Sequence, residues 1–400
     1  MTNQLPRRVL TVNTGSSSLK SGLYEETENG SLARRLSAEV IRIGEPGCRM
    51  RIVDSIGKKI LDADQNLPSH ESAIKALFEW IEGHEDYKNF EAAGHRVVHG
   101  GNRYRQPQAV TPDLISTLRG LVRFDPDHLP QAIAGIEAVT RLYPSLKQVA
   151  CFDTAFHQEM PKVARMYALP REYFDEGVLR YGFHGLSYEY VVQQLVSIYG
   201  PSAGGRIIAA HLGNGASITA IRDGKSVDTT MGFTPTEGLV MGTRSGDIDP
   251  GVMVYLCMEK KMTAEEIDDL INKKAGLLGV SGISEDMRDL LGKEATNTSA
   301  AEAIDLFCYR AMKYIAAYVA VLGGLDMLVF TGGIGEHAAP VRSRICQGLE
   351  YLGVRVDEDL NASGQPLISS SASQVKIRVI PANEDVIIAG HTFSVIANQL

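Results

Sequence analysis

The sequence is poor in features that mark secreted, nucleic-acid-binding or zinc proteins. Its five cysteines are scattered, odd in number and never arranged as C-x-x-C. This pattern excludes a disulfide framework or a structural zinc site and favours a reducing compartment. The formal net charge of −8 argues against nucleic acid or an anionic membrane as the main partner. We therefore expect neither nucleic-acid binding nor membrane association.

The chain also has no long uninterrupted apolar run. Its most apolar stretch, residues 314–330, is broken by Gly323, Gly324 and Asp326. A membrane helix needs about 20 predominantly apolar residues, so this stretch is better explained as helix, turn and strand. The polar start, MTNQLPRRVL, reaches strand-like sequence within a few residues, and we expect no signal peptide. The composition, 44% hydrophobic and 22% charged, is typical of a globular protein.

Strand-like and helical patterns alternate along the chain, which predicts an α/β fold. Residues 130–143 place apolar side chains on one helical face, and LKQVACFD follows as a buried strand that ends at Asp153. Near the C-terminus, residues 326–330 read as a strand, TGGIGEH as a loop and residues 340–352 as a helix. A strand at 376–380 and a final helix complete this pattern.

Three glycine-bearing loops follow apolar runs: NTGSSSLK (13–20), HLGNGAS (211–217) and TGGIGEH (331–337). Glycine lets backbone N–H groups approach phosphate oxygens, and the helix after the third loop could add its N-terminal dipole. The order of VNTGSSSLK excludes a Walker A motif. A tight turn explains any single loop, but three in one chain favour a nucleotide. Lys20 could then supply charge and Asn13 a donor for Mg²⁺.

A weak internal repeat accompanies these loops. A shift of 200 residues places Gly215 on Gly15 and Ser217 on Ser17, in each case between two apolar strands. The shared strand–loop–strand context is a modest indication of a duplicated domain.

Arginine and histidine occur in unusual settings. Arg96 lies in GHRVVHGG, His184 in RYGFHGLS and Arg244 in MGTRSGDIDPG. Arginines in glycine-rich loops are typical anion ligands. The alternatives are a salt bridge from Arg244 to Asp247 or Asp249 and a packed, hydrogen-bonded His184.

Two carboxylates follow strand-like segments. Asp153 ends the strand LKQVACFD, and Glu384 lies in NEDV. Each could serve catalysis, bind a metal or cap a helix, and for NEDV the capping alternative falls on Asn383 or Asp385.

Nine motifs in this order resemble the acetate kinase family over nearly the whole chain: TVNTGSSSLK, GHRVVHGG, FDTAFH, RYGFHG, HLGNGAS, DTTMGFTPTEGLVMGTRSGDIDP, GLLGVSGISEDMR, TGGIGE and NED. The resemblance implies two duplicated ribonuclease H-like (actin-like ATPase) domains, each with a five-stranded mixed sheet and flanking helices, with the nucleotide in the cleft between them. The implied domains are 1–153 with 385–400, and 154–384, the latter with the nucleotide site and a dimer interface.

The implied activity is reversible phosphoryl transfer, ATP + acetate ⇌ ADP + acetyl phosphate. It depends on Mg²⁺, for which Mn²⁺ could substitute, in a cytoplasmic homodimer. Two alternatives stay open: a propionate or broader short-chain carboxylate kinase, and a non-catalytic nucleotide-dependent binding protein of the same superfamily. Val98 favours acetate over propionate, because a smaller residue there would deepen the pocket.

Site residues follow from the resemblance, position by position. Asn13 and Glu384 look like the magnesium residues, Arg96 the carboxylate ligand, Asp153 the catalytic aspartate, and His184 and Arg244 the transition-state stabilisers. The acyl pocket would comprise Val98, Phe183 and Pro235. Nucleotide contacts would come from Lys20, His211, Leu212, Gly213, Asn214, Gly215, Asp286, Met287, Arg288, Gly333, Ile334, Gly335, Glu336 and His337.

The chemistry needs no general base, because acetate is already ionised at pH 7. The demand is in-line positioning and neutralisation of charge on the transferred phosphoryl group. We therefore expect Asp153 to position Mg²⁺ or its water.

The sequence departs from the family pattern in FDPDHLP, residues 124–130. Asp127 stands before His128, where an apolar residue usually lines the acetate methyl pocket, and Asp125 replaces a small residue. An ionised Asp127 beside a methyl group would cost desolvation energy and repel a carboxylate. His337 replaces the asparagine that usually follows G-I-G-E.

Overall fold

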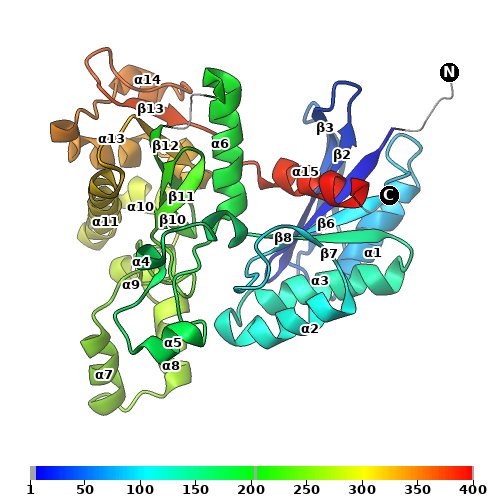
Figure 1. Cartoon of the computed structure of the whole chain (residues 1–400), viewed down its shortest axis with the longest axis horizontal. Helices are drawn as coiled ribbons and strands as arrows, with labels where there is room; N and C mark the ends of the chain where they lie inside the picture. Colours follow the sequence, from blue (N-terminus) through cyan, green and yellow to red (C-terminus); the bar gives the residue numbers. More distant parts are fainter. Residues whose placement is uncertain (1–5, 202–204, 399–400) are drawn as a thin grey trace. The chain divides into compact units, whose positions relative to one another are not determined.

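The structure, a computed structural model, describes residues 6–201 and 205–398. The chain divides into two compact units. Unit 1 comprises Met1–Ala155 and Asn383–Leu400, and unit 2 comprises Phe156–Ala382. The short 3-10 helix η2 (Ala155–His157) spans the change from one unit to the other. Figure 1 labels many of the helices and strands of both units.

Unit 1 contains an eight-stranded mixed sheet in the order β5-β4-β3-β2-β1-β6-β8-β7. Its elements are β1 (Arg8–Thr14), β2 (Ser18–Glu26), β3 (Leu32–Ile41), β4 (Arg49–Asp54), β5 (Lys59–Asp64), α1 (His70–Glu82), β6 (Ala92–Val97), β7 (Gln108–Ala109), α2 (Pro112–Leu121), η1 (Val122–Phe124), α3 (Leu129–Leu142), β8 (Lys147–Phe152) and α15 (Glu384–Ala397). Strands β1 to β5 pair antiparallel, whereas β1, β6 and β8 run parallel.

The two faces of this sheet are covered by different helices. Side chains alternate between faces along a strand. On β6, Ala93 and Val97 pack in the cores formed with α1, α2 and α3. Gly94 faces α15, and a Cβ there would lie 2.1 Å from Thr392 Oγ1, so only glycine permits this close packing. Figure 1 shows α15, in red, against the strands of this sheet. Arg96, two residues after Gly94, therefore faces α15 as well.

Unit 2 contains a five-stranded mixed sheet in the order β11-β10-β9-β12-β13. Its elements are α4 (Lys162–Arg165), α5 (Arg171–Asp175), α6 (Gly185–Tyr199), β9 (Arg206–Leu212), β10 (Ala216–Arg222), β11 (Lys225–Thr229), α7 (Pro250–Met258), α8 (Ala264–Lys273), α9 (Gly276–Ser281), α10 (Met287–Lys293), α11 (Thr298–Leu322), β12 (Met327–Thr331), α12 (Gly332–His337), α13 (Ala339–Gln347), η4 (Glu350–Leu352), α14 (Glu358–Ala362) and β13 (Lys376–Val379).

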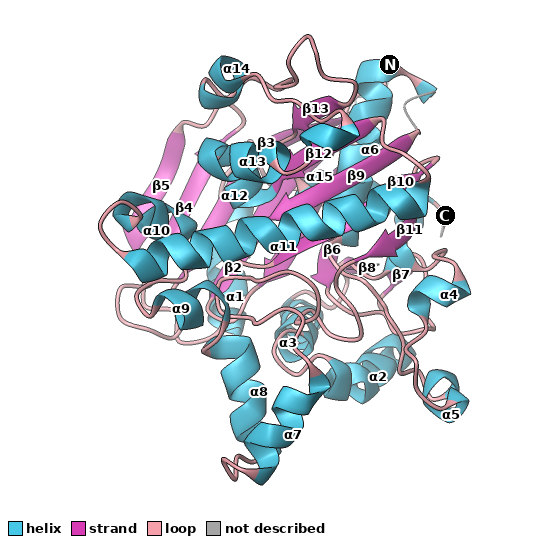
Figure 2. Cartoon of the chain, turned by 90° about the vertical axis from the view of Figure 1, so that its left-hand side faces the viewer, coloured by secondary structure: helices cyan, strands magenta, loops and turns pink. Residues whose placement is uncertain are grey.

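Helices cover the second sheet as well. Apolar residues of α6, including Tyr188, Val191 and Leu195, pack with residues of β9, β10 and β12. The 25-residue α11 packs against strands β9, β10 and β11, and Figure 2 shows it lying over this sheet. It ends at Gly323, whose φ of 71° lies in the left-handed region that favours glycine. Among the residues that the structure describes, no helix has the length and apolar character needed to cross a membrane.

The two sheets share one five-strand topology. In unit 1 the order β3-β2-β1-β6-β8 has antiparallel pairs up to β1 and parallel pairs from β1 onward. In unit 2 the order β11-β10-β9-β12-β13 has the same pattern. This agreement confirms the predicted α/β fold with two mixed sheets. The prediction of five strands per sheet is correct for unit 2 and too low for unit 1, where β4, β5 and β7 extend the sheet.

The three glycine-bearing segments follow the carboxyl ends of β1, β9 and β12. NTGSSSLK joins β1 to β2, and HLGNGAS joins β9 to β10, so the strand–turn–strand prediction is correct for both. TGGIGEH differs from the prediction, because Gly332–His337 forms the short helix α12 instead of a loop. Gly332 has a φ of 76°, and a Cβ there would lie 2.8 Å from the Leu212 carbonyl oxygen. Glycine at this position lets α12 begin directly beside the end of β9.

Candidate active site

In unit 1, three of the predicted side chains converge where β6 and β8 end. Arg96 Nη2 lies 2.6 Å from Asp153 Oδ2, and Arg96 Nε lies 3.5 Å from Glu384 Oε2. Asp153 follows β8 directly, and its N–H donates to the Val97 carbonyl at 3.0 Å. Glu384 begins α15, on the face of the sheet that Arg96 also occupies. Ligand sites in α/β sheets form at such carboxyl ends of parallel strands.

The charges at this edge are strongly coupled. Burial alone would lower the pKa of Arg96, but the carboxylates of Asp153 and Glu384 outweigh it and raise that pKa further. Asp153 is fully buried, and the positive charge of the Arg96 guanidinium offsets the cost of burying its carboxylate. The pKa of Asp385 is raised, first by desolvation and then by the negative charge of Glu384.

Asn383 caps α15, as its side chain accepts a hydrogen bond from Val386 N. The capping alternative therefore holds for Asn383.

The hairpin of β1 and β2 carries the other predicted residues of unit 1. Asn13 and Lys20 are directly opposed in the antiparallel register. Gly15 N donates to the Ser18 carbonyl at 2.8 Å and closes the turn between the strands. The Lys20 ammonium is largely exposed and lies 3.9 Å from Glu39, a distance at which it can exchange this partner for a ligand.

In unit 2, two histidines stack beside the loop from β9 to β10. The rings of His184 and His211 are 4.3 Å apart between centroids and 24° from parallel. His184 Nδ1 lies 2.8 Å from Ser217 Oγ, and His211 Nδ1 lies 2.8 Å from Ser187 Oγ. Each ring is thus held through Nδ1 by a serine hydroxyl. The hydrogen-bonded alternative for His184 is met, and it leaves the ring orientation set for a further role.

The same loop is adjacent to Arg244. A Cβ at Gly215 would lie 3.4 Å from His184 Nε2 and 3.9 Å from Arg244 Nη1, so both groups border this glycine. Gly242 N donates to the Asn214 carbonyl at 2.9 Å, which ties the loop that carries Arg244 to the loop after β9.

The two aspartates considered as partners of Arg244 both accept hydrogen bonds from backbone N–H groups. Asp247 accepts from Gly238 N, and Asp249 caps α7 by accepting from Gly251 N. Both carboxylates therefore serve to shape the loop between β11 and α7, which carries Arg244.

Predicted nucleotide segments from three distant parts of the sequence line one cavity of about 340 Å³ in unit 2. They come from the β9–β10 loop, the start of α10 and the helix α12. The lining residues are Gly213, Asn214, Asp286, Met287, Arg288, Leu291, Gly333, Ile334, His337, Ala338 and Pro340. The fold thus brings together three segments, the first and last of which are more than a hundred residues apart in the sequence.

The three predicted acyl-pocket residues differ in burial and belong to different units. Val98 and Pro235 are half-buried, whereas Phe183 is 1% exposed. Val98 lies in unit 1 with Arg96, and Phe183 and Pro235 lie in unit 2 with His184 and Arg244. The predicted site residues therefore come from both units. Asp127 is half-buried, and Asp125 is buried with its carboxylate 2.9 Å from His128 Nδ1.

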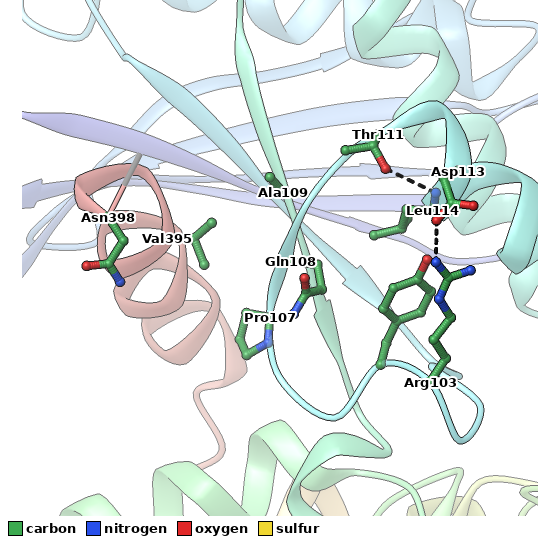
Figure 3. Close-up of a pocket in the computed structure, with 10 residues that line it drawn as sticks. Arg103, Pro107, Gln108, Ala109, Thr111, Asp113, Leu114, Val395 and Asn398 are labelled. Atoms are coloured by element: carbon green, nitrogen blue, oxygen red, sulfur yellow. Dashed lines mark hydrogen bonds and ion pairs between the residues drawn. The ribbon is translucent and has the colours of Figure 1, made fainter. Parts of the chain in front are cut away.

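A larger cavity of about 560 Å³ in unit 1 contains none of the predicted residues. It lies between the segment from Arg103 to Leu114 and the end of α15 (Figure 3). Arg103 and Asp113, which form an ion pair on its wall, are both exposed. The cavity therefore lacks a concentrated charge of either sign.

Two sets of supporting residues in unit 2 were not predicted from the sequence. Arg180 pairs with Glu237 and donates to the carbonyls of Thr229 and Thr230 at 3.1 and 3.0 Å, and Tyr167 also binds Glu237. Arg342 holds the end of α12. Isolated arginines on helices or in loops usually lie at the surface, so the sequence carries no local signal for either role.

The donors at the edge of unit 1 suit a divalent cation that also binds phosphate. Within the described ranges, no group of three or more His, Cys, Asp or Glu could by itself hold a metal ion. Mg²⁺ is usually bound by one or two carboxylates together with substrate phosphates and water. The oxygens of Asn13, Asp153 and Glu384 are of the required type.

The chain is similar to known proteins over nearly its whole length. Residues 8–390 match the model of the acetokinase family. The chain is 48% identical to the acetate kinase of Rhodopseudomonas palustris (strain TIE-1), over 96% of this chain and 97% of that protein. It is similar to the crystal structure of Porphyromonas gingivalis acetate kinase, with a TM-score of 0.86 and 38% identity over 98% of this chain and 100% of that one. It is also similar to a propionate kinase from Francisella tularensis, with a TM-score of 0.90 and 37% identity over 97% and 99%.

These matches define the class of protein as a kinase with a carboxylate acceptor. The chain belongs to the acetokinase family, as the order of its motifs predicted.

Proposed function

We propose that this chain transfers the γ-phosphoryl group of ATP reversibly to acetate and forms acetyl phosphate and ADP. The cavity lined by three predicted nucleotide segments is the observation that supports this function best. The family and the acetate kinases among its relatives support the same reaction. The two units would correspond to the ATPase domains expected from the resemblance, 1–153 with 385–400 and 154–384.

The reaction is a direct in-line displacement. A carboxylate oxygen of acetate attacks the γ-phosphorus, and the bond from that phosphorus to the bridging oxygen of ADP breaks. Both reactants are anions, so the protein must hold them together and neutralise charge on the equatorial oxygens. Arg96 would bind the acetate carboxylate in place of part of its contact with Asp153. His184 and Arg244 would donate to the transferred phosphoryl group.

Mg²⁺, or Mn²⁺ in its place, would neutralise phosphate charge when bound. Asn13 and Glu384 would hold it, and Asp153 would orient the metal or its water. Glu384 lies 3.5 Å from Arg96. A metal ion bound by Glu384 would therefore change the charge that surrounds Arg96, and metal binding and carboxylate binding would influence each other.

Acetate is the first choice among short carboxylates, and propionate is the second. Val98 supports acetate, because its branched side chain would shorten the proposed acyl pocket. The similarity to a propionate kinase supports the alternative. Trapping of the acyl phosphate with hydroxylamine, with acetate, propionate and butyrate as acceptors, tests both. We expect the highest kcat/KM with acetate. If no acid yields an acyl phosphate, the chain is a nucleotide-dependent binding protein instead.

We also propose that the enzyme is a cytoplasmic homodimer. The sequence of α7, PGVMVYLCM, has no charged residue, and Val252, Val254, Tyr255 and Met258 are exposed on it. A second copy of the chain would cover this apolar surface. Light scattering of wild type and of Val254→Asp tests the assembly, and a wild-type monomer would overturn it.

A further inference from the structure

Arg342 of α13 is one of the most deeply buried side chains in unit 2. It is 1% exposed and makes four hydrogen bonds to neutral oxygens. Nη1 donates to the carbonyls of Gly335 and Glu336, both at 2.8 Å. Nε and Nη2 donate to the side chain and the backbone carbonyl of Asn361 at 2.7 and 3.0 Å. Desolvation lowers the pKa of this guanidinium.

The two carbonyls that Arg342 binds belong to the last turn of α12. The last four carbonyls of a helix lack partners within the helix, and the negative end of its dipole lies there. Ala338 N satisfies the carbonyl of Ile334 at 2.9 Å, and Arg342 satisfies those of Gly335 and Glu336. A planar guanidinium can hold two such carbonyls at once, which a lysine ammonium does with less geometric definition.

Asn361 in turn fixes the arginine. This residue of α14 is 1% exposed, and its Nδ2 donates to the Ala339 carbonyl at 3.0 Å and to Ser343 Oγ at 2.8 Å. Asn361 thus joins α14 to α13 through its Nδ2, and its Oδ1 and backbone carbonyl accept from the guanidinium. The contacts form one continuous set from α14 through Arg342 to the end of α12.

The helix that this set holds lines the nucleotide cavity. Gly333, Ile334 and His337 of α12 face that cavity, and the α12 carbonyls bound by Arg342 lie among them in the sequence. Burying a cation among neutral partners is costly, and an apolar side chain would fill a position that serves packing alone at lower cost. Six residues are also too few for a helix to be stable without support from its surroundings.

We propose that Arg342 is a positioning residue, which holds α12 in the conformation that presents Gly333, Ile334 and His337 to the nucleotide. This inference rests on the proposed function, because it requires that the cavity bind ATP and ADP. It predicts that loss of the Arg342 guanidinium weakens nucleotide binding specifically. Carboxylate recognition, which depends on unit 1, should stay nearly unchanged.

Arg344 provides a matched control. It lies on the same helix two residues later, but pairs with Glu294 at 2.5 Å and Asp305 at 3.4 Å and makes no contact of this kind with α12. Arg342→Met, Arg342→Lys and Arg344→Met should be compared by titration with a fluorescent ADP analogue and by steady-state kinetics. Thermal unfolding reports which variants fold.

We expect Arg342→Met to raise the Kd for the ADP analogue and the KM for ATP at least tenfold. Arg342→Lys should raise both about threefold to tenfold, and the KM for acetate should stay within twofold for each. Arg344→Met should bind the analogue as wild type does. A folded Arg342→Met or Arg342→Lys with wild-type nucleotide affinity would overturn the proposal, as would an equal loss in Arg344→Met.

The lysine variant decides the question if the methionine variant does not fold. A merely structural role would lower the unfolding temperature of Arg342→Lys without separating the two KM values, and that result also overturns the proposal. Failure of the proposed function has a different signature, since wild type itself would then bind no ADP analogue.

Discussion

Arg96 and Asp153 form an ion pair, with Nη2 and Oδ2 2.6 Å apart, at the carboxyl ends of two adjacent parallel strands. The strand register places Arg96 beside Cys151, and Asp153 follows two residues later on the same face. Glu384 approaches the same guanidinium from the start of α15. One cation thus stands between two carboxylates at the edge where we propose that a third carboxylate, the substrate, binds.

Replacing Arg96 by lysine should weaken acceptor binding. Lysine keeps the charge but loses the fork that can bind Asp153 and acetate together, so we expect the KM for acetate to rise about 10- to 100-fold. Steady-state kinetics at saturating ATP measure this change. Arg8→Lys is the control, because Arg8 of β1 forms a comparable partly buried pair with Glu25 at 2.8 Å. Equal effects in both variants would contradict a substrate role for Arg96.

Asp153→Asn should impair turnover and alter the metal requirement. The amide keeps the shape of the side chain but removes the negative charge that would orient Mg²⁺ or its water. We expect kcat to fall at least about 100-fold, and the Mg²⁺ concentration for half-maximal rate to rise. Kinetics over a range of Mg²⁺ concentrations test this. Near-normal turnover with unchanged Mg²⁺ dependence would exclude both a metal-positioning and an acid–base role.

The preference of the enzyme for acetate over the longer propionate should depend on Val98. Val98→Ala removes two methyl groups from the proposed acyl pocket and makes room for one more methylene. We expect the ratio of kcat/KM for propionate to that for acetate to rise at least about tenfold, the lower end of the discrimination that one methylene gives in an apolar pocket. The same ratio in Asp127→Leu shows whether Asp127 contributes to the pocket. An unchanged ratio in Val98→Ala would place the acyl group elsewhere.

His184→Asn should separate chemistry from folding. His184 has a φ of 58°, and asparagine tolerates this left-handed conformation better than most residues. The variant should therefore fold, with an unfolding temperature close to that of wild type, while kcat falls about 100-fold or more through loss of a donor to the phosphoryl group. Differential scanning fluorimetry and kinetics measure the two effects. A variant with normal kcat would assign His184 a structural role only.

Acid should destabilise the protein well above the range in which its carboxylates titrate. Desolvation lowers the pKa values of His95, His99 and His157 to about 4 each. In the unfolded chain these rings titrate near 6.5, so the unfolded state binds more protons between about pH 6.5 and 4. Stability is thus full above about pH 6.5 and falls as the pH drops.

From pH 7 to pH 5, the free energy of unfolding should fall by roughly 2 kcal/mol for each of these histidines. Urea titrations at the two pH values measure it. In His157→Gln, which removes one buried imidazole, the decrease should be smaller by about that amount. An equal decrease in wild type and variant would show that His157 does not contribute.

Much of the fold was predictable because it depends on local patterns. The apolar helical face expected over residues 130–143 corresponds to α3, Leu129–Leu142. The strand before Asp153 and the hairpin around Gly15 also follow from apolar runs and turn residues. The extra strands of unit 1 were not predicted. The two-residue β7 is too short for a periodic pattern, and β4 and β5 lie at an edge where few side chains are buried.

The sequence by itself determined the family, the alternation of strands and helices, and the residue types that a kinase of carboxylates needs. Motif order and local periodicity are sufficient for those conclusions. Only the tertiary structure decided that Arg96 stands between Asp153 and Glu384, that three distant segments line one cavity, and that Arg342 is buried under α12. These relationships depend on strand register and helix packing between residues far apart in the chain, and no local pattern encodes which distant partner a side chain meets.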